Sequence, residues 1–434
     1  MKIREKIREQ IPEWAHRIKR LRTEYSNFVV GEVTIEQILS GIRGVQISIS
    51  DISYVDPSEG IRLRGYTVPQ VLNLLPKARN SEIPLAGGLY YLLLTGELPS
   101  VLDAEEVEKE WRERSKVPSC VWDVIRAMPK ETHPMTLFSQ AIMALQPESL
   151  FAGAYQNGLP KSAYWEYYLE DSFNLTAKIP QIAAFIYCWK YRNMRMESPE
   201  TELDWSANFA RMIGKGDDHQ YMELMRLYFV LHSDHEGANV SAHTSHLVSS
   251  ALSDAYLSSA AGMNGLAGPL HGLANQECIR WLVGVYSQFG RPPSDFELEQ
   301  VIRSQLAAGM VIPGYGHAVL RVTDPRFTAQ LEFAEKFLPH DHLFQLVKQV
   351  YRIAPIILGE NGKIKNPLPN VDAINGCLQY YYGVQEVDFY TVLFGVSRIL
   401  GLTAHAVWAR ALGKPIERPK SLTTRMLEER VGIG

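Results

Sequence analysis

The sequence contains few cysteines, and none of them are close together. The four cysteines, Cys120, Cys188, Cys278 and Cys377, form no C-x-x-C pair in a chain of 434 residues. Zinc modules need ligands at short spacing, and disulfide frameworks need several paired cysteines. The sequence therefore predicts neither, and reduced thiols in a reducing compartment are the simplest interpretation.

The chain also lacks an excess of basic residues. Lys and Arg total 44 and Asp and Glu total 48, which gives a formal net charge of −4. Proteins that bind nucleic acid or anionic membranes usually carry a basic excess, so we expect neither partner. The most apolar late stretch, residues 391–413, contains Arg398, His405 and Arg410, which a membrane-spanning segment rarely does.

No secretory signal or transit peptide is apparent in residues 1–22. They lack an apolar h-region and contain Glu5, Glu9 and Glu13, whereas transit peptides are poor in acidic residues. Apolar residues recur there at helical spacing instead. We therefore expect a bacterial cytoplasmic protein, with the mitochondrial matrix as the alternative for a processed chain.

Strand signals are sparse, and helix signals dominate. Residues 45–49 alternate between apolar and polar, and residues 52–55 and 61–64 flank a turn at 56–60, which predicts a small hairpin. Capping patterns at 67–70, 294–297 and 324–325 predict helix starts. A doubly wound sheet needs many apolar strands between helices, and these are missing. The predicted fold class is mainly α.

Glycine motifs for nucleotide binding are missing as well. No G-x-x-x-x-G-K-[ST] occurs, and the closest approach to G-x-G-x-x-G, at Gly314 and Gly316, has Val319 at the third glycine position. The sequence therefore favours neither P-loop phosphate chemistry nor a Rossmann dinucleotide site.

Two histidines lie among glycines, in a setting that favours chemistry. His271 belongs to NGLAGPLHGLANQE and His317 to PGYGHAVLR. Glycines allow close backbone approach and unusual dihedral angles, so a histidine on such a loop is a catalytic candidate. The alternative for each is a tight turn between helices with an incidental histidine.

A second histidine group raises the question of a metal. His232, His235, His243 and His246 contain two H-x-x-H spacings, which suit a metal site on a helix. However, the string H-E-x-x-N that begins at His235 lacks the second histidine of a zincin. Histidines satisfied by their helix neighbours are the simpler interpretation.

An aspartate and several arginines complete the set of candidates. Asp372 lies in NPLPNVDAING, where it is either a helix N-cap or a rigidly held base. Arg398 lies in an otherwise apolar helix and must snorkel or meet an anion, because an unpaired buried charge is costly. Guanidinium groups match carboxylates with paired hydrogen bonds. Together with Arg326 and Arg418, these residues fit acid–base chemistry on a small polycarboxylate.

These candidates lie in strings that resemble those of the citrate synthase family, of the mitochondrial and related bacterial type. The strings are LHSDHEGANVSAHTSH, NGLAGPLHGLANQE, PGYGHAVLR, NPLPNVDAING and LFGVSRILG with ERPKS. A looser similarity covers residues 18–420. The resemblance implies a mainly α, two-domain helical fold with a small β-hairpin region near the N-terminus. Residues 1–273 and 383–434 would form a large domain and residues 274–382 a small one, in a homodimer.

The resemblance also implies the reaction, which is that of citrate (Si)-synthase. This acyltransferase of the tricarboxylic acid cycle converts acetyl-CoA, oxaloacetate and water into citrate and CoA. Asp372 would remove a methyl proton from acetyl-CoA, His271 would hydrogen-bond the thioester oxygen, and His317 would polarise and protonate the oxaloacetate carbonyl. The residues that would hold oxaloacetate or citrate are His235, Arg326, Arg398 and Arg418 of the partner subunit.

The same resemblance implies a site for acetyl-CoA as cosubstrate, with no tightly bound cofactor and no metal. Backbone groups of the loop at 311–316 would recognise adenine, and basic side chains would meet the phosphates. The residues implied are Arg43, Lys161, Val311, Gly314, Tyr315, Gly316, Arg321, Lys365 and Asn370. Lys161 stands where the mitochondrial type usually has Arg, and Ile374-Asn375 replaces the usual His-Ser after Asp372.

Three alternatives remain at this point. A 2-methylcitrate synthase would share the motifs and use propionyl-CoA, because one methylene is worth only about 1–3 kcal/mol in an apolar pocket. A metal-dependent hydrolase would use the histidine group. A non-catalytic protein that binds CoA or a carboxylate is disfavoured by the intact set of His271, His317 and Asp372.

Overall fold

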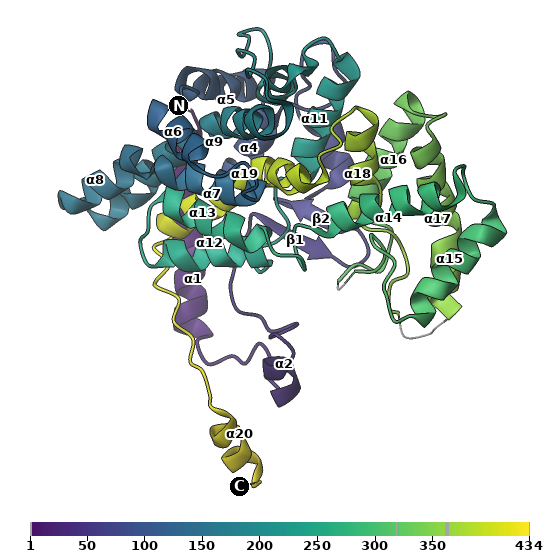
Figure 1. The fold of residues 1–434 in the computed structure, drawn as a ribbon. Helices are drawn as coiled ribbons and strands as arrows, with labels where there is room; N and C mark the ends of the chain where they lie inside the picture. The colour runs from purple at the N-terminus through teal and green to yellow at the C-terminus, as the bar shows by residue number, and fades with distance from the viewer. Residues whose placement is uncertain (1, 318, 361–363, 434) are drawn as a thin grey trace.

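The described chain forms many helices and one small sheet (Figure 1). The computed structural model describes residues 2–317, 319–360 and 364–433. The prediction of a mainly α fold is confirmed. The α-helices are α1 (Lys2–Glu24), α2 (Ile35–Leu39), α3 (Val68–Leu74), α4 (Ala86–Thr95), α5 (Val101–Arg114), α6 (Ser119–Ala127), α7 (Pro134–Ala144), α8 (Leu150–Gln156), α9 (Tyr164–Tyr187), α10 (Trp205–Ala210), α11 (His219–Leu231), α12 (Val240–Ser250), α13 (Ala255–Leu266), α14 (Ala274–Phe289), α15 (Asp295–Ala307), α16 (Pro325–Phe337), α17 (His342–Glu360), α18 (Asp372–Tyr381), α19 (Tyr390–Ala411) and α20 (Thr424–Val431). Short 3-10 or π-helical turns are η1 (Gln146–Glu148), η2 (Lys161–Ala163), η3 (Cys188–Arg192), η4 (Arg211–Lys215) and η5 (Val387–Phe389).

The sheet confirms the predicted hairpin and adds a third strand. Strands β1 (Ser53–Asp56), β2 (Gly60–Leu63) and β3 (Tyr66–Thr67) pair antiparallel in the order β1-β2-β3. Gly60 closes the turn with φ +87°, and a Cβ there would lie 2.5 Å from the ring of Pro325, so the position requires glycine. Residues 45–49 form no strand, because they lie on an extended, mostly exposed segment with no strand beside them.

The predicted helix starts are confirmed by their caps. The Thr67 side chain accepts from the backbone of Gln70, and the Gln70 side chain accepts in return from the backbone of Thr67. Ser294 and Glu297 form the same reciprocal pair at α15. Asp324 caps α16 by accepting from the backbone N–H of Arg326 at 2.9 Å. Each cap satisfies helix N–H groups that would otherwise lack a partner.

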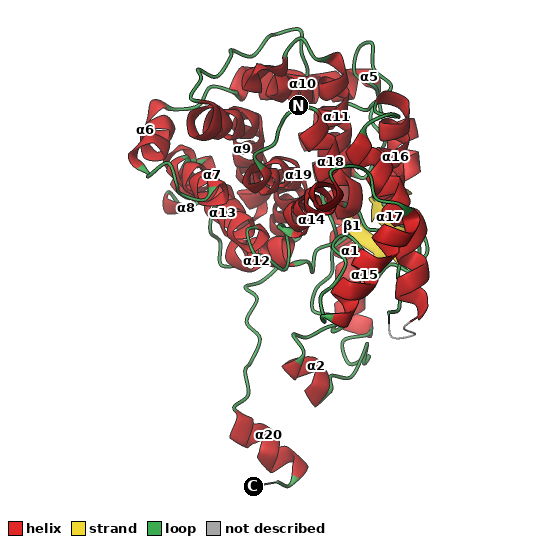
Figure 2. Ribbon diagram, turned by 45° about the vertical axis from the view of Figure 1, so that its right-hand side comes forward, coloured by secondary structure: helices red, strands yellow, loops and turns green. Residues whose placement is uncertain are grey.

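Helix α19 runs through the middle of the molecule (Figure 2). Nearly all of its side chains are buried, including that of Arg398. Within the described residues it is the one helix long and apolar enough to cross a membrane, and 94% of that window is buried inside the protein. A core helix of a large helical protein has this character. Because α19 contacts α4, α9, α11, α12, α13 and α14, its polar residues can join several elements.

Helices α14 to α18 gather on one side of the body, and α4 to α13 surround α19 on the other (Figure 1). The chain enters the first group after residue 273 and leaves it after α18. The division into domains at 1–273 with 383–434, and 274–382, stays a prediction.

Two terminal segments extend away from the body (Figures 1 and 2). One comprises residues 25–50 with α2, and the other residues 415–433 with α20. Both carry large apolar side chains that face solvent in a single chain. Phe28, Val30, Leu39, Ile416 and Ile433 are 61–73% exposed.

Candidate active site

His271 lies in the loop between α13 and α14, with its Nε2 against the start of α12. The backbone N–H of Ser241 donates to Nε2 at 3.3 Å, and the Ser241 hydroxyl lies 3.1 Å from the same atom. Since Nε2 accepts, the proton of the neutral ring is on Nδ1. Burial and then the charge of Arg398 lower the pKa of His271 to about 4. The loop therefore presents a neutral imidazole whose Nδ1–H is available as a donor.

His317 has the opposite arrangement. The backbone N–H groups of Val319 and Leu320 donate to its Nδ1 at 3.0 and 2.9 Å. The proton of the neutral ring is therefore on Nε2. Burial, followed by the charge of Arg326, lowers the pKa of His317 below its ordinary value.

His235 lies beside His317, with 5.7 Å between the ring centroids. It belongs to the turn between α11 and α12. Burial and the neighbouring Arg326 and Arg398 hold the pKa of His235 well below its ordinary value. Both rings are therefore neutral at physiological pH and can accept or donate single hydrogen bonds.

Arg398 reaches this cluster from the middle of α19. Its side chain is 1% exposed, and it donates to the His232 carbonyl at 3.2 Å, the Ser241 hydroxyl at 3.2 Å and the Asn239 side-chain oxygen at 3.4 Å. Burial lowers its pKa to about 10, with Asp234 opposing that shift. Arg398 is therefore charged at neutral pH, and the groups it bonds are neutral. The alternative of a snorkelling arginine is wrong, because the guanidinium stays inside the protein.

Arg326 is paired with a carboxylate. It lies in the first turn of α16 and donates to both oxygens of Asp324 at 2.7–3.2 Å. Burial opposes ionisation of Asp324, but Arg326 holds its pKa below the ordinary value. Sequence reasoning identified Asp324 only as a helix cap, although it also neutralises a buried arginine.

Asp372 is the first residue of α18, next to this pair. It does not act as the N-cap, since that position is Val371. Burial raises the pKa of Asp372 to about 6, while Arg326 opposes and Asp324 adds to the shift. Its carboxylate makes no hydrogen bond within the described residues. Such a group, ionised at pH 7 and with raised basicity, suits a general base.

The loop at 311–316 packs directly on the segment before Asp372. The side-chain oxygen of Asn370 accepts from the backbone N–H of Asp372 at 2.9 Å, and its amide donates to the Gly316 carbonyl at 3.1 Å. Tyr315 forms a β-bridge with Pro369. A Cβ on Gly314 would lie 2.7 Å from the backbone of Ala373, so glycine is required for this approach. Val311 at the start of the loop is exposed.

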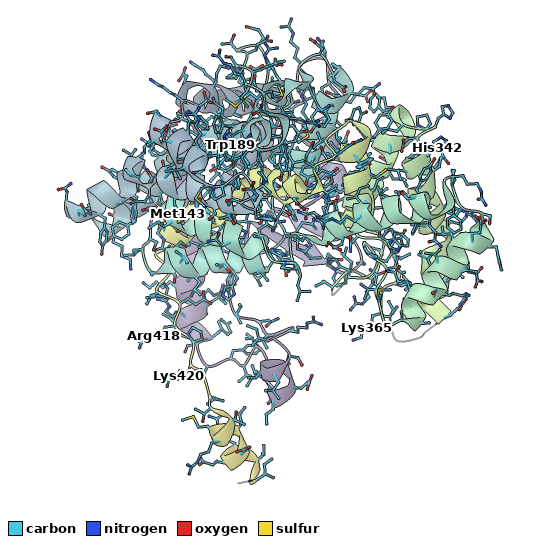
Figure 3. All side chains as sticks on the ribbon, in the orientation of Figure 1. Met143, Trp189, His342, Lys365, Arg418 and Lys420 are labelled. Carbon is cyan, nitrogen blue, oxygen red and sulfur yellow. The ribbon has the colours of Figure 1, made fainter. Side chains whose placement is uncertain are left out.

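Of the basic residues implied for CoA or for the substrate from the partner subunit, Arg321 lies near His317, and its charge contributes to lowering the pKa of that histidine. The Arg321 guanidinium donates to the carbonyls of Val319 and Leu320. Arg43 lies on the extended N-terminal segment, and Arg418 lies on the extended C-terminal one, away from Lys365 (Figure 3). Lys161 is exposed at the start of η2. In the part of the chain that the structure describes, no hydrogen bond or ion pair joins Arg43, Lys161, Lys365 or Arg418 to the histidine and arginine cluster.

The departure at Asn375 has a visible consequence. Its side-chain amide donates to Nε2 of His232 at 3.0 Å, and His232 donates from Nδ1 to the Tyr228 carbonyl at 2.8 Å. Asn375 thus joins α18 to the end of α11. Sequence reasoning missed this role, as it missed Ser241 and Asn239, although all of them lie inside or beside the motifs.

The histidine group does not converge on one point. His232 bonds Tyr228 and Asn375, His235 faces His317, and His243 donates toward Glu417 on the C-terminal segment. Among residues 2–317, 319–360 and 364–433, no three His, Cys, Asp or Glu side chains are arranged to hold a metal ion.

The sequence and the fold both match known proteins of one family. Residues 41–420 match the family described as citrate synthase, C-terminal domain. A probable mitochondrial citrate synthase of Glossina morsitans morsitans is 53% identical over 430 residues, covering 99% of this chain and 92% of the relative. The mitochondrial citrate synthase of Xiphias gladius is 51% identical over 431 residues with the same coverage. The crystal structure of citrate synthase from Pyrobaculum aerophilum superposes with a TM-score of 0.79 at 26% identity, covering 91% of this chain and 95% of that one.

The chain belongs to the citrate synthase family. It is an acyltransferase that condenses acetyl-CoA with oxaloacetate and water to give citrate and CoA, the entry reaction of the tricarboxylic acid cycle. Neither of these two curated relatives is named as a 2-methylcitrate synthase.

Proposed function

We propose that the condensation runs by acid–base enolisation, with Asp372 as base, His271 as donor to the thioester oxygen and His317 as acid toward oxaloacetate. The observation that carries the proposal is the pair of opposite tautomers. Nε2 of His271 and Nδ1 of His317 are both occupied by backbone N–H groups, which leaves one N–H free on each ring.

The thioester methyl is a very weak acid, so a carboxylate removes its proton only when the developing oxygen charge is stabilised. Asp372, with a pKa of about 6, is a stronger base than an ordinary aspartate and is still ionised at pH 7. The neutral Nδ1–H of His271 supplies the hydrogen bond to the enol or enolate oxygen. A neutral donor is suitable because its acidity is closer to that of the enol than an imidazolium's would be.

Oxaloacetate supplies the electrophile. We propose that its carboxylates bind Arg326, Arg398 and His235, so that its carbonyl oxygen meets Nε2–H of His317. Donation from His317 polarises the carbonyl, and the enol carbon attacks it to form citryl-CoA. Water then cleaves the thioester to release citrate and CoA.

The two histidine roles can be tested separately. His271→Gln should lower kcat by ~10²–10³-fold, the usual cost of losing one oxyanion donor, with the KM for oxaloacetate little changed. His317→Gln should lower kcat and also weaken oxaloacetate binding. Thiol release from acetyl-CoA gives both constants. If both variants lose only oxaloacetate affinity, His271 does not act on the thioester.

Acyl preference is tested with the same assay. The expected result is a higher kcat/KM for acetyl-CoA than for propionyl-CoA, with thiol release dependent on oxaloacetate. A preference for propionyl-CoA would replace the assigned activity with that of 2-methylcitrate synthase, because the two differ by one methylene in the pocket.

We propose that acetyl-CoA binds where the loop at 311–316 meets the segment at 366–370. The loop's backbone and Asn370 would recognise adenine, and Arg43, Arg321, Lys365 and the partner's Lys161 would meet the phosphates. The region 274–382 would act as the small domain and close on the large one, which excludes water before condensation. No tightly bound cofactor or metal takes part in this scheme, so full activity after dialysis against a chelator is the expected result.

We propose a homodimer in which Arg418 of the partner subunit completes each site. The support is the extended, apolar terminal segments, which a soluble single chain rarely exposes on this scale. A complementation experiment tests it. Asp372→Asn and Arg418→Ala chains are each inactive alone, but a mixed dimer has one intact site, so a 1:1 mixture regains about a quarter of wild-type activity. No regain would mean that each chain uses its own Arg418.

We propose the mitochondrial matrix as the location, which is the alternative stated above for a processed chain. The curated relatives named here are mitochondrial, and the comparisons give no support to the bacterial cytoplasm expected from the start of the chain. Co-fractionation of the protein with matrix markers in its source cells tests the assignment.

A further inference from the structure

Asp234 is a buried carboxylate that directly precedes His235 in the chain, and its side chain is hydrogen-bonded to His405 and Ser53 rather than to a residue assigned to substrate. It is 1% exposed. One of its oxygens, Oδ2, accepts from His405 Nε2 at 2.8 Å and from the Ser53 hydroxyl at 2.6 Å. Although burial opposes ionisation, His405 and Arg398 hold the pKa of Asp234 below its ordinary value. Asp234 is therefore ionised inside the protein, and its hydrogen bonds and neighbouring charges offset the cost of burying that charge.

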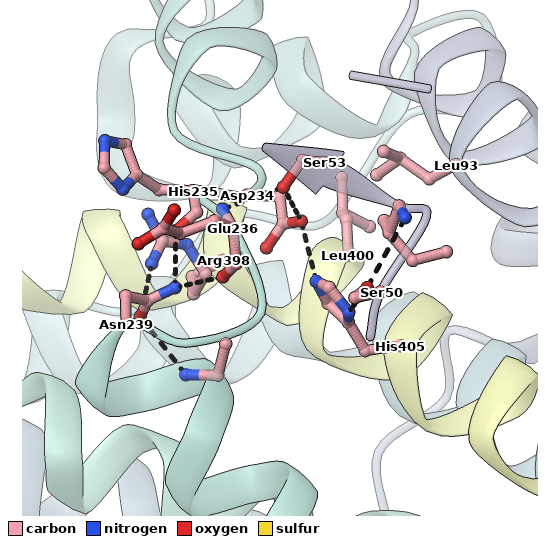
Figure 4. Close-up of polar contacts among 12 residues, drawn as sticks. Ser50, Ser53, Leu93, Asp234, His235, Glu236, Asn239, Arg398, Leu400 and His405 are labelled. Atoms are coloured by element: carbon pink, nitrogen blue, oxygen red, sulfur yellow. Dashed lines mark hydrogen bonds and ion pairs between the residues drawn. The ribbon is translucent and has the colours of Figure 1, made fainter. Parts of the chain in front are cut away.

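The contacts continue on both sides of Asp234 (Figure 4). Nδ1 of His405 lies 2.7 Å from the hydroxyl of Ser50. With Nε2–H donating to Asp234, Nδ1 accepts from the Ser50 hydroxyl in the neutral ring and donates to the Ser50 oxygen in the protonated ring, so the contact is made in both states. On the other side, the Ser53 oxygen accepts from the backbone N–H of Glu236 at 2.8 Å. The result is one continuous series of hydrogen bonds from Ser50 through His405, Asp234 and Ser53 to the Glu236 peptide.

The hydrogen bonds hold the backbone of Glu236 in an unfavourable conformation. Its φ is +56°, a left-handed conformation that costs a non-glycine residue free energy and persists only when its surroundings enforce it. The peptide that precedes Glu236 belongs to His235, whose ring faces His317. The direction of the His235 side chain therefore depends on holding Glu236 in this conformation.

A second set of contacts holds the same turn from the substrate side. The Asn239 amide donates to the carbonyls of His235 and Glu236 at 2.7 and 2.6 Å, and the Asn239 oxygen accepts from Arg398. Arg398 and His405 are seven residues apart on α19, two helical turns along one face. One rigid helix thus carries a residue assigned to oxaloacetate and the residue that fixes the loop bearing His235.

We propose that His405 is a positioning residue for oxaloacetate, acting through Asp234 and Ser53 on the turn that presents His235. His405 touches neither substrate. It orients the Asp234 carboxylate, which orients the Ser53 hydroxyl, which holds the Glu236 N–H. The inference rests on the proposed binding of oxaloacetate at His235 and Arg398, and it adds a determinant of affinity that no motif contains.

The test compares His405→Leu with His405→Gln. Leucine removes the donor, whereas a glutamine amide can still donate to Asp234. For His405→Leu we expect the KM for oxaloacetate to rise ~10–50-fold, with kcat and the KM for acetyl-CoA changed less than about threefold, because only one carboxylate contact is displaced. His405→Gln should restore the KM to within about threefold of wild type. Exposed His16 on α1 provides the matched control, His16→Gln, which should leave all constants unchanged.

Ser53→Ala gives a second route if His405→Leu folds poorly. It keeps the His405–Asp234 pair but cuts the link to Glu236, so it should raise the KM for oxaloacetate to a similar degree. The proposal is overturned if both variants fold with an unchanged KM for oxaloacetate, or if glutamine at 405 is as impaired as leucine. Arg398→Met, measured in parallel, distinguishes a failure of the positioning role from a failure of the proposed oxaloacetate site. If Arg398→Met also leaves the KM for oxaloacetate unchanged, the proposed substrate site is wrong. If Arg398→Met raises this KM and the other variants do not, only the positioning role of His405 is wrong.

Discussion

The candidate site has two walls that hold their arginines in different ways. The first wall, built from α12, the α13–α14 loop and α19, carries Arg398 and His271. The second wall, built from residues 311–317 and 319–326 and the start of α18, carries His317, Arg326 and Asp372. Arg398 donates only to neutral oxygens, whereas Arg326 is bound to the carboxylate of Asp324.

The difference shows how one site combines binding with base chemistry. Arg398 is hydrogen-bonded to no carboxylate, although the Asp234 anion lies near enough to affect its pKa, so a substrate carboxylate displaces no carboxylate from its N–H groups. On the second wall, Asp324 offsets Arg326, and this allows Asp372 to reach a pKa of about 6 despite a neighbouring cation. The base, Asp372, and the donor to the enol or enolate oxygen, His271, therefore come from different walls.

Removing the base should have the largest effect. Asp372→Asn is expected to lower kcat for thiol release by ~10²–10⁴-fold, the usual contribution of a general base, while oxaloacetate still binds. The exposed Asp123→Asn on α6 is the matched control and should behave as wild type. If Asp372→Asn keeps more than a tenth of the activity, another group takes the proton.

The two arginines should respond differently to the same change. Arg398→Met should raise the KM for oxaloacetate by about 30-fold or more, because a charged hydrogen bond of roughly 2–3 kcal/mol is lost, with little loss of stability. Arg326→Met should also raise this KM, but it leaves Asp324 as a buried unpaired charge. We expect unfolding free energy to fall by about 3–5 kcal/mol in that variant. Denaturant unfolding and steady-state kinetics on both variants check the contrast, and equal stability would refute it.

The acid limb of the pH–rate profile reports the protonation of Asp372 on the second wall. A base with a pKa of about 6 is protonated below that value, so kcat/KM for acetyl-CoA should fall tenfold per pH unit below about pH 6 and level off above it. Asp324 raises the pKa of Asp372, so Asp324→Asn, which retains a good helix cap, should move this limb to lower pH. A shift to higher pH in that variant would contradict the assigned interaction.

The smallest effect on activity should come from the bridge between α18 and α11. Asn375→Ala leaves Nε2 of buried His232 without a donor, so we expect unfolding free energy to fall by about 1–3 kcal/mol. Because Asn375 touches no assigned substrate group, kcat should change only a few-fold. A large loss of kcat with unchanged stability would instead indicate a direct role next to Asp372.

Much of the fold could be predicted from local sequence. The reciprocal caps at Thr67 and Ser294 and the turn at 56–60 depend on residues within four positions of each other, so their patterns can be read directly. Strand β3 has only two residues and was missed. The alternation at 45–49 predicted a strand that does not form, because a strand needs a partner that local pattern cannot supply.

Local sequence patterns are sufficient to predict the class of fold and to identify two histidines in glycine-rich loops, an aspartate that proves to be the first residue of α18, and arginines in unusual settings. The protonation states and hydrogen-bond partners of these residues depend on the tertiary structure. Backbone N–H groups two to three residues away fix the tautomer of His317, but Ser241, thirty residues away in sequence, fixes that of His271. The partners of Arg398 and the chain from His405 to Glu236 join segments more than 150 residues apart. Protonation and orientation depend on such long-range contacts and on burial, which no local pattern contains.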